Sequence, residues 1–272
     1  MRLRVKDVEF SYRSVRVLNG VSMELAESEM LGIVGPNGTG KSTLIRCLNR
    51  ILSPQKGTVL LDVWDIKKIR LIVQDIKKMS LMELARKIGY IPQTTSQVFP
   101  ATVFDTILMG RRPHVGWRSS EKDTEKVLEM LRLLNIEEFA MRDINELSGG
   151  QQQKVFIARA LTQEPDILLL DEPTSNLDIR HQLEVMDIIK NIIRKKGISA
   201  IVAIHDLNLA ARYSDRVLMM NSGKIFAAGN PSSVLTPANI RDVYGVEADV
   251  TNNSDNGRPY IVPIRAVRED ER

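Results

Sequence analysis

The chain has 272 residues, of which 43% are hydrophobic, 26% charged and 5% aromatic. This composition is typical of a globular protein and excludes disordered and collagen-like chains. The 38 Lys and Arg against 34 Asp and Glu give a net charge of +4, a field too weak over this length to favour a nucleic-acid partner. The longest apolar runs are strand-sized, well short of the roughly 20 residues of a membrane span. A single cysteine, and an N-terminus without the apolar core of a signal peptide, favour a reducing cytoplasm.

The N-terminal part of the chain predicts mostly strands. Apolar and polar residues alternate over 3–8 and 21–25, as in half-buried antiparallel strands, and 30–34 is continuously apolar, as in a buried strand. A helix is predicted over 42–52 because its apolar residues recur at helical spacing, and 57–62 predicts the next strand.

The rest of the chain alternates helices with short apolar strands. Helices are predicted over 121–134, 151–162 and 180–195, and strands over 87–92, 167–170 and 198–204, the last two of parallel-sheet character. An Asn-Gly turn at 256–257 predicts a hairpin near the C-terminus. The sequence therefore predicts an α/β fold with an antiparallel β subdomain and an α-helical subdomain of about 95–162. We expect one domain over 1–246 and a tail over 247–272.

A short duplication interrupts the β subdomain. Asp65-Ile-Lys-Lys is followed ten residues later by Asp75-Ile-Lys-Lys. A repeat this brief is too short for a solenoid, whose repeats have periods of roughly 20 residues or more. It is interpreted as a surface excursion that contributes nothing to chemistry.

A phosphate-binding pattern, G-x-x-x-x-G-K-[ST], stands between the strand at 30–34 and the helix that follows, where its chemistry requires it. Its residues are Gly35, Pro36, Asn37, Gly38, Thr39, Gly40, Lys41 and Ser42, with Thr43 next in the helix. Glycines let backbone N–H groups surround a phosphate, the ammonium of Lys41 adds a point charge, and the hydroxyl of Ser42 is a ligand for Mg²⁺. The pattern predicts a nucleoside triphosphate site.

Polar residues follow two further apolar strands. Asp171 and Glu172 come at the end of 167–170, where Asp171 is placed to hold the metal and Glu172 to polarise a water for attack on the γ-phosphate. His205 follows the strand at 198–204 and should reach the same sheet edge, where it can orient the attacking water. Glu172, His205 and Lys41 are the predicted catalytic groups, and Asp171 is a predicted metal ligand.

A second glycine-rich segment identifies a family. Leu147-Ser148-Gly149-Gly150-Gln151 precedes a helix but has no lysine or metal ligand of its own. With the motifs above, it makes the chain resemble the ATP-binding subunits of ABC transporters, which are P-loop NTPase cassettes with a RecA-like core. The resemblance implies ATP and Mg²⁺ as cofactors. It also implies a head-to-tail homodimer in which Ser148 to Gln151 close on the γ-phosphate held by the partner, so that two ATP molecules are sandwiched.

The resemblance also implies roles for individual residues. Tyr12 corresponds to the aromatic residue that stacks on adenine, and Val17 is a second candidate for the same wall. Gln93 falls at the glutamine that reaches Mg²⁺ and senses the membrane partner. Asp178 lies in the loop that communicates across the dimer, where Asn176 replaces the usual alanine. Glu172 matches the catalytic glutamate and His205 the switch histidine.

Within the family, the segments 110–114, 205–215 and 229–246 resemble ATPases of importers for iron-siderophore, haem or cobalamin complexes. This implies two integral-membrane permease subunits, a periplasmic or lipid-anchored binding protein, and a place on the cytoplasmic face of the cell membrane. The segment 103–144 is then expected to form a groove for a permease helix, with Arg111 and Arg112 as exposed contacts. The alternative is a soluble ABC-type ATPase of cofactor assembly that engages no permease.

Overall fold

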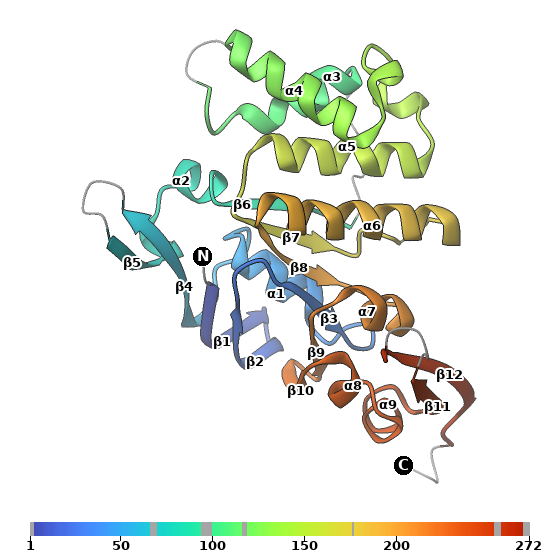
Figure 1. Cartoon of the computed structure of the whole chain (residues 1–272). Coiled ribbons are helices and arrows are strands. Elements are labelled where there is room, and N and C mark those ends of the chain that lie inside the picture. The colour runs from blue at the N-terminus through green and yellow to red at the C-terminus, as the bar shows by residue number, and fades with distance from the viewer. Residues whose placement is uncertain are drawn as a thin grey trace. The chain divides into compact units, whose positions relative to one another are not determined.

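A computed structural model describes residues 3–65, 70–93, 100–115, 119–175, 177–252 and 257–268. The chain forms two compact units (Figure 1). Unit 1 combines Met1–Lys78 with Ser199–Arg272, and unit 2 is Met79–Ile198. The first and last parts of the sequence thus share one unit, and the middle forms the other.

Unit 1 contains an antiparallel sheet in the order β2-β1-β4-β5. Its strands are β1 (Leu3–Tyr12), β2 (Val15–Leu25), β4 (Lys56–Asp65) and β5 (Arg70–Asp75). The predicted alternation is visible in two stretches of β1, where Leu3 and Val5 and then Val8 and Phe10 are buried, and a register shift between Val5 and Val8 changes the phase by one residue. Since side chains alternate between the two faces of a strand, this pattern fixes the pairing register, with Leu3 opposite Leu25 of β2.

The duplicated sequence belongs to this sheet. β4 and β5 pair antiparallel as far as Asp65 opposite Arg70, and the second copy continues from Asp75 into a short 3₁₀ helix, η1 (Ile76–Lys78). Residues 66–68 of the first copy lie outside the described residues. The excursion is therefore an extended pair of strands on the β subdomain.

The other strands of unit 1 are ordered β10-β9-β3-β8. They are β3 (Met30–Val34), β8 (Ser199–Ala203), β9 (Arg216–Asn221) and β10 (Lys224–Gly229). β3 runs parallel to both β8 and β9, while β9 and β10 are antiparallel. Every residue of β3 and β8 is buried, as is typical of parallel strands covered on both faces.

Helix α1 (Lys41–Leu48) follows β3 and is shorter than the predicted 42–52. It ends because Arg50 adopts a left-handed backbone conformation with φ 55° and its N–H bonds to the carbonyl of Cys47. Ile51, which fitted the helical spacing, is 53% exposed. The apolar period therefore extended beyond the helix itself.

The C-terminal part of unit 1 consists of three short helices and two strands. They are α7 (Leu207–Tyr213), α8 (Pro231–Val234), α9 (Pro237–Tyr244), β11 (Val246–Asn252) and β12 (Pro259–Ala266). β11 and β12, red in Figure 1, pair antiparallel with each other, and β12 lies against α7.

Unit 2 combines one parallel strand pair with helices. The strands are β6 (Ile88–Ile91) and β7 (Ile167–Asp171), and the α-helices are α2 (Leu81–Ala85), α3 (Val103–Leu108), α4 (Glu121–Leu134), α5 (Gly149–Thr162) and α6 (Ile179–Lys196). Short 3₁₀ helices are η2 (Met109–Arg111), η3 (Glu137–Phe139) and η4 (Ile144–Glu146). α5 packs against α3, α4 and α6. Among the described residues, no helix combines the length and apolarity that crossing a bilayer requires.

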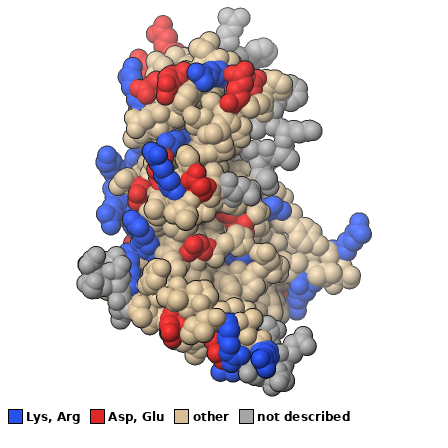
Figure 2. Space-filling model, turned by 90° about the vertical axis from the view of Figure 1, so that its right-hand side faces the viewer, with Lys and Arg blue, Asp and Glu red and all other residues tan. Residues whose placement is uncertain are grey.

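Arg111 is not the exposed contact that the sequence suggested. Its side chain is 9% exposed, and its guanidinium lies 2.8 Å from both Asp123 and Glu164 and donates to the carbonyl of Thr162 at 2.7 Å. The pair with Asp123 ties η2 to the first turn of α4, where Asp123 also forms a capping box with Ser120. Arg112 is exposed, as expected. On the face shown in Figure 2, charges of both signs occur, in keeping with the small net charge.

Arg111→Met should lower the free energy of unfolding at neutral pH by about 3 kcal/mol, since it leaves the buried Asp123 carboxylate without its guanidinium. Arg112→Met is the matched control and should change that free energy by less than about 0.5 kcal/mol. Urea unfolding followed by circular dichroism measures both. Equal effects of the two substitutions would contradict a structural role for Arg111.

The effect of Arg111→Met should shrink in acid. The backbone N–H of Ser120, followed by the Arg111 guanidinium, lowers the pKa of Asp123 from 3.8 to about 2. A lowered pKa in the folded state stabilises the fold above the unfolded-state value of about 4, and this contribution is lost as the pH falls toward 2. The difference between wild type and Arg111→Met should therefore be smaller at pH 3 than at pH 7.

Candidate functional site

The predicted site residues fall into two groups, one in each unit. Unit 1 holds Tyr12, Val17, the phosphate loop 35–43 and His205. Unit 2 holds Gln93, the segment 148–151, Asp171, Glu172 and Asp178. Asn176, in the predicted communication loop, lies outside the described residues.

The phosphate loop has a shape that only glycine permits at two of its positions. Gly35 follows β3 with φ 147°, and a Cβ there would lie 2.4 Å from the carbonyl oxygen of Met220. Gly40 precedes α1 with φ 100°, and a Cβ there would lie 2.8 Å from the side chain of Leu18. Any side chain at either position would push the loop away from the strands beneath it, so the glycines keep the backbone amides at the start of α1 in place.

The side chain of Lys41 bends back over the loop. It is 4% exposed, and Nζ donates to the carbonyls of Gly35 at 2.7 Å and Pro36 at 3.1 Å. The hydroxyl of Thr39 also donates to Pro36, at 2.9 Å. Asn37 and Gly38 are exposed at the tip of the loop, Thr43 is buried within α1 and Ser42 is partly exposed. An ammonium held at the centre of the loop is positioned to meet a phosphate.

The strand register brings His205 to the phosphate loop's edge of the sheet. In the parallel pair of β3 and β8, Ile33 lies opposite Ala203. Gly35 and His205 each follow two residues later, and the N–H of Ile204 bonds to the carbonyl of Ile33 at 2.9 Å. His205 is exposed. Within unit 1, the histidine thus follows β8 at the same edge of the sheet at which the phosphate loop follows β3.

The two residues proposed for adenine differ in position. Val17 lies beside the phosphate loop, because a Cβ on Gly40 would come within 2.9 Å of its carbonyl oxygen and 3.4 Å of its side chain. Tyr12 ends β1, is 43% exposed, and packs edge-on against Phe10 with ring centroids 4.9 Å apart. Val17 thus lies next to the phosphate loop, while the Tyr12 side chain is partly exposed to solvent.

Unit 2 shows the same register at its strand pair. Ile91 of β6 lies opposite Leu170 of β7, and Gln93 and Glu172 each follow two residues later. Their side chains meet directly, with the amide of Gln93 donating to the carboxylate of Glu172. Asp171, the last residue of β7, is fully buried. Residues 79 positions apart in the sequence thus form one polar group.

Glu172 is held in a strained backbone conformation. Its φ of 53° is uncommon for any residue other than glycine, and the residue is 6% exposed. Ser175 stabilises this turn through two bonds to the carbonyl of Glu172, from its N–H at 3.1 Å and from its hydroxyl at 2.9 Å. Strain of this kind persists where the surroundings over-determine it, and it is common at functional sites.

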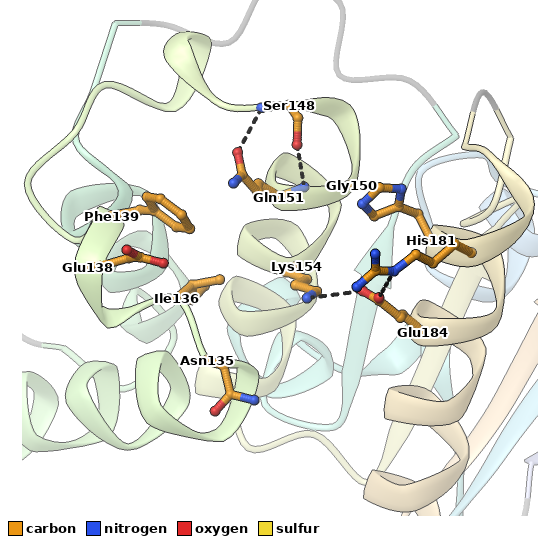
Figure 3. Close-up of a pocket in the computed structure, with 11 residues that line it drawn as sticks. Asn135, Ile136, Glu138, Phe139, Ser148, Gly150, Gln151, Lys154, His181 and Glu184 are labelled. Atoms are coloured by element: carbon orange, nitrogen blue, oxygen red, sulfur yellow. Dashed lines mark hydrogen bonds and ion pairs between the residues drawn. The ribbon is translucent and has the colours of Figure 1, made fainter.

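The segment 148–151 forms the first turn of α5 rather than preceding it. Ser148 is the N-cap, and it exchanges capping-box bonds with Gln151, 3.4 Å from the Gln151 N–H to Oγ and 3.0 Å from the Ser148 N–H to Oε1. The sequence placed the helix start at Gln151 because two consecutive glycines read as loop. The turn lines a pocket of about 310 Å³, together with Lys154 of the same helix and Glu184 of α6 (Figure 3).

His181, for which the sequence predicts no role, joins two of the motifs. Its Nδ1 lies 2.8 Å from the carboxylate of Asp178, which also accepts from the backbone N–H of His181 and so caps α6. The ring packs on Gly150, where a Cβ would lie 2.7 Å from the His181 ring (Figure 3). These bonds, the backbone one first, lower the pKa of Asp178. An Asp followed three residues later by His at a helix start was the available signal.

These groups have the chemistry that a magnesium nucleotide needs. The loop around Gly35 and Gly40 leaves no room for side chains and presents the amides of a helix N-terminus, which suits phosphate. The Ser42 hydroxyl, the Gln93 amide oxygen and the Asp171 carboxylate are hard oxygen donors of the kind that Mg²⁺ prefers.

Comparison with known proteins agrees with this chemistry. The sequence pattern of the family described as "ABC transporter" matches residues 18–175. An uncharacterized ABC transporter ATP-binding protein of Methanocaldococcus jannaschii is 49% identical over 97% of this chain and 98% of its own length. A petrobactin import ATP-binding protein of Bacillus anthracis is 36% identical over 98% of this chain and 96% of its own.

Solved structures show the same fold. An inward-facing transporter assigned to the metal-chelate type has a chain that superposes with a TM-score of 0.81 at 26% identity, covering 97% of both chains. An ATP-binding cassette captured as a dimer with ADP and phosphate superposes with a TM-score of 0.72 at 28% identity, covering 84% of this chain and 98% of its own. The predicted cassette fold is confirmed. Motifs, relatives and solved structures agree, and the chain belongs to the ABC transporter family as one of its ATP-binding cassette ATPases.

Proposed function

We propose that this ATPase powers an importer for an iron(III)-siderophore, haem or cobalamin-type complex. It acts as a homodimer on the cytoplasmic face of the cell membrane, beneath two permease subunits, and a periplasmic or lipid-anchored binding protein delivers the cargo. The petrobactin relative and the metal-chelate type structure support this class of cargo. The dimeric cassette structure supports the assembly.

The structural observation that carries the coupling of ATP hydrolysis to the permease is the hydrogen bond from Gln93 to Glu172. It joins the glutamine that the family resemblance assigns to sensing the permease to the glutamate assigned to hydrolysis. A shift of Gln93 would release or restrain the carboxylate of Glu172. Movement of a permease helix against unit 2 could in this way control when ATP is hydrolysed.

In the proposed reaction, the phosphate loop and Lys41 bind and orient the triphosphate, and Val17 and Tyr12 pack against the adenine. Nζ of Lys41 exchanges its carbonyl partners for phosphate oxygens. Ser42, Gln93 and Asp171 would hold Mg²⁺, which would supply positive charge to neutralise the phosphate oxygens.

Hydrolysis itself needs a base and a correctly placed water. Glu172 accepts a proton from a water molecule as the water oxygen attacks the γ-phosphorus. The bond between the γ-phosphorus and the oxygen that bridges it to the β-phosphate breaks, which releases ADP and phosphate. His205 orients that water and the γ-phosphate. Ser148 to Gln151 of the partner subunit close the site from the opposite side, and Asp178 lies in the loop that reports this closure across the dimer.

Glu172→Gln should lower kcat for Mg-ATP hydrolysis by about 10² to 10⁴-fold, because an amide keeps the shape but cannot accept the proton. Binding of a fluorescent ATP analogue should remain. Glu125→Gln, which changes an exposed glutamate of α4, is the matched control and should hydrolyse normally. Lys41→Ala should instead weaken nucleotide binding. Full turnover in Glu172→Gln would remove Glu172 from its proposed role.

In the Glu172→Gln background, ATP should produce a dimer on size-exclusion chromatography, and Ser148→Arg should abolish it. A large side chain at Ser148 keeps the first turn of α5 from approaching the partner's phosphate. Ser80→Arg is the matched control, since Ser80 is likewise an exposed N-cap in a capping box, on α2. An ATP-dependent dimer that survives Ser148→Arg would refute the sandwich.

Docking to the permease should depend on Arg112 and not on the buried Arg111. Arg112→Glu should leave the basal ATPase rate unchanged and reduce its stimulation by reconstituted permease about fivefold, since an exposed ion pair contributes up to about 1 kcal/mol. Lys195→Glu, an exposed charge reversal on α6, is the control. Unimpaired stimulation in Arg112→Glu would move the docking surface elsewhere in 103–144.

A further inference from the structure

We propose that Asn208 and Arg258 are positioning residues for His205, through which the β11–β12 hairpin holds helix α7 and fixes the loop that carries the histidine. This inference rests on the proposed role of His205 in hydrolysis. All of the residues concerned lie in unit 1. The hairpin would then be part of the hydrolytic machinery rather than an appendage.

Asn208 binds the hairpin as a second peptide group would. Its Nδ2 donates to the carbonyl of Ile261 at 3.0 Å, and its Oδ1 accepts from the N–H of the same residue at 2.8 Å. The side chain therefore satisfies both backbone groups of a residue in β12. A two-point contact fixes orientation as well as distance, so the first turn of α7 is set relative to the strand.

Arg258 holds the other end of the same helix. It lies just before β12, and one guanidinium nitrogen donates to the carbonyls of Ala211 at 2.7 Å, Arg212, and Ser214 at 3.3 Å. The last carbonyls of a helix lack partners within it and carry its negative dipole. A guanidinium here satisfies both needs, so the hairpin grips α7 at its first and its last turn.

Both ends of helix α7 are connected to segments of the predicted nucleotide site. At the start, Asp206 follows His205 directly and accepts from the N–H groups of Asn208 at 2.7 Å and Leu209 at 3.0 Å. The histidine is thus one residue from a cap that fixes the helix. The position of α7 determines where the His205 backbone lies.

At its far end, α7 is packed against β3, which leads into the phosphate loop. A Cβ on Gly32 would lie 2.3 Å from Oγ of Ser214, so the Ser214 side chain packs against the β3 backbone in space that only glycine leaves open. Asp215 exchanges two bonds of 2.8 Å with Met30 at the beginning of β3. The contact of Ser214 with Gly32 opposes movement of α7 toward β3, and the bonds of Asn208 and Arg258 oppose movement in the opposite direction.

The hairpin and the His205 loop do not fill the space between them. His205, Asn208, Tyr244 and Ile261 line one pocket of about 310 Å³. A loop beside such a space is not fixed by close packing on that side. The hydrogen bonds from Asn208 and Arg258 hold α7, and with it the His205 loop, on the side where close packing is incomplete.

The test uses the full-length chain with Asn208→Ala and Arg258→Met, each made with His205 intact and in a His205→Ala background. With His205 intact, each should lower kcat for Mg-ATP roughly tenfold and leave KM within about twofold, as expected when a catalytic group is misplaced. Arg258→Lys should lose less, because it keeps a cation near the carbonyls. Arg265→Met is the matched control, since it removes an ion pair within the hairpin, to Glu247 at 2.8 Å.

The His205→Ala background separates positioning from a general structural effect. If Asn208 and Arg258 act by positioning His205, then Asn208→Ala and Arg258→Met should cause no further loss of kcat in the His205→Ala background. A further tenfold loss of kcat in that background would overturn the proposal that Asn208 and Arg258 position His205, while leaving the role of His205 intact. A loss in Arg265→Met equal to that in Arg258→Met would also overturn it. Normal turnover in His205→Ala alone would instead overturn the proposed function of the histidine.

Discussion

The pairing register of the parallel strands places the predicted site residues of each unit side by side at one edge of the sheet. In unit 1, Gly35 and His205 follow paired residues of β3 and β8 by the same two positions, and in unit 2 Gln93 and Glu172 do so after β6 and β7. Hydrogen bonding fixes how two strands run beside each other, so residues far apart in sequence come out together at the edge. Glycines, turns and hydrogen bonds after the strands then hold these residues in place.

Holding a polar group at a strand end requires that the chain turn sharply, and the protein uses different devices for this. After β3, glycine allows the turn, because Gly35 lies against the carbonyl of Met220 with no space for a side chain. After β7, Glu172 itself adopts the left-handed conformation, and Ser175 stabilises it. The left-handed conformation of a glutamate there costs strain of order 1 to 3 kcal/mol, in keeping with the role in hydrolysis that we propose for its carboxylate.

Sequence reasoning predicted what depends on local spacing. The phosphate loop, the strand before it and the acids after β7 are short patterns whose meaning is set by neighbouring residues. The end of α1 and the start of α5 were misplaced by a few residues, because an apolar period can outlast a helix and Gly149-Gly150 reads as loop although Ser148 caps the helix there.

Long-range partners were beyond local patterns. Arg111 looks like a surface charge in sequence, but it is buried and forms an ion pair with Glu164, which lies 53 positions away. Asn208 and Ile261 are likewise separated by 53 positions. Nothing local marks an arginine or an asparagine as half of such a pair, since its partner is chosen by topology.

His181 shows how two motifs can be mechanically joined within one unit. Its ring is bonded to Asp178 on one side and touches Gly150 on the other, so the loop before α6 and the first turn of α5 share one side chain. Gly150 has to be glycine for the ring to fit, and the ring has to be held by Asp178 to stay there. A displacement of either segment would move the other, because close-packed contacts transmit shifts rather than absorb them. In the proposed dimer these segments face the partner's nucleotide, so closure at one would be felt at the other without any longer chain of contacts.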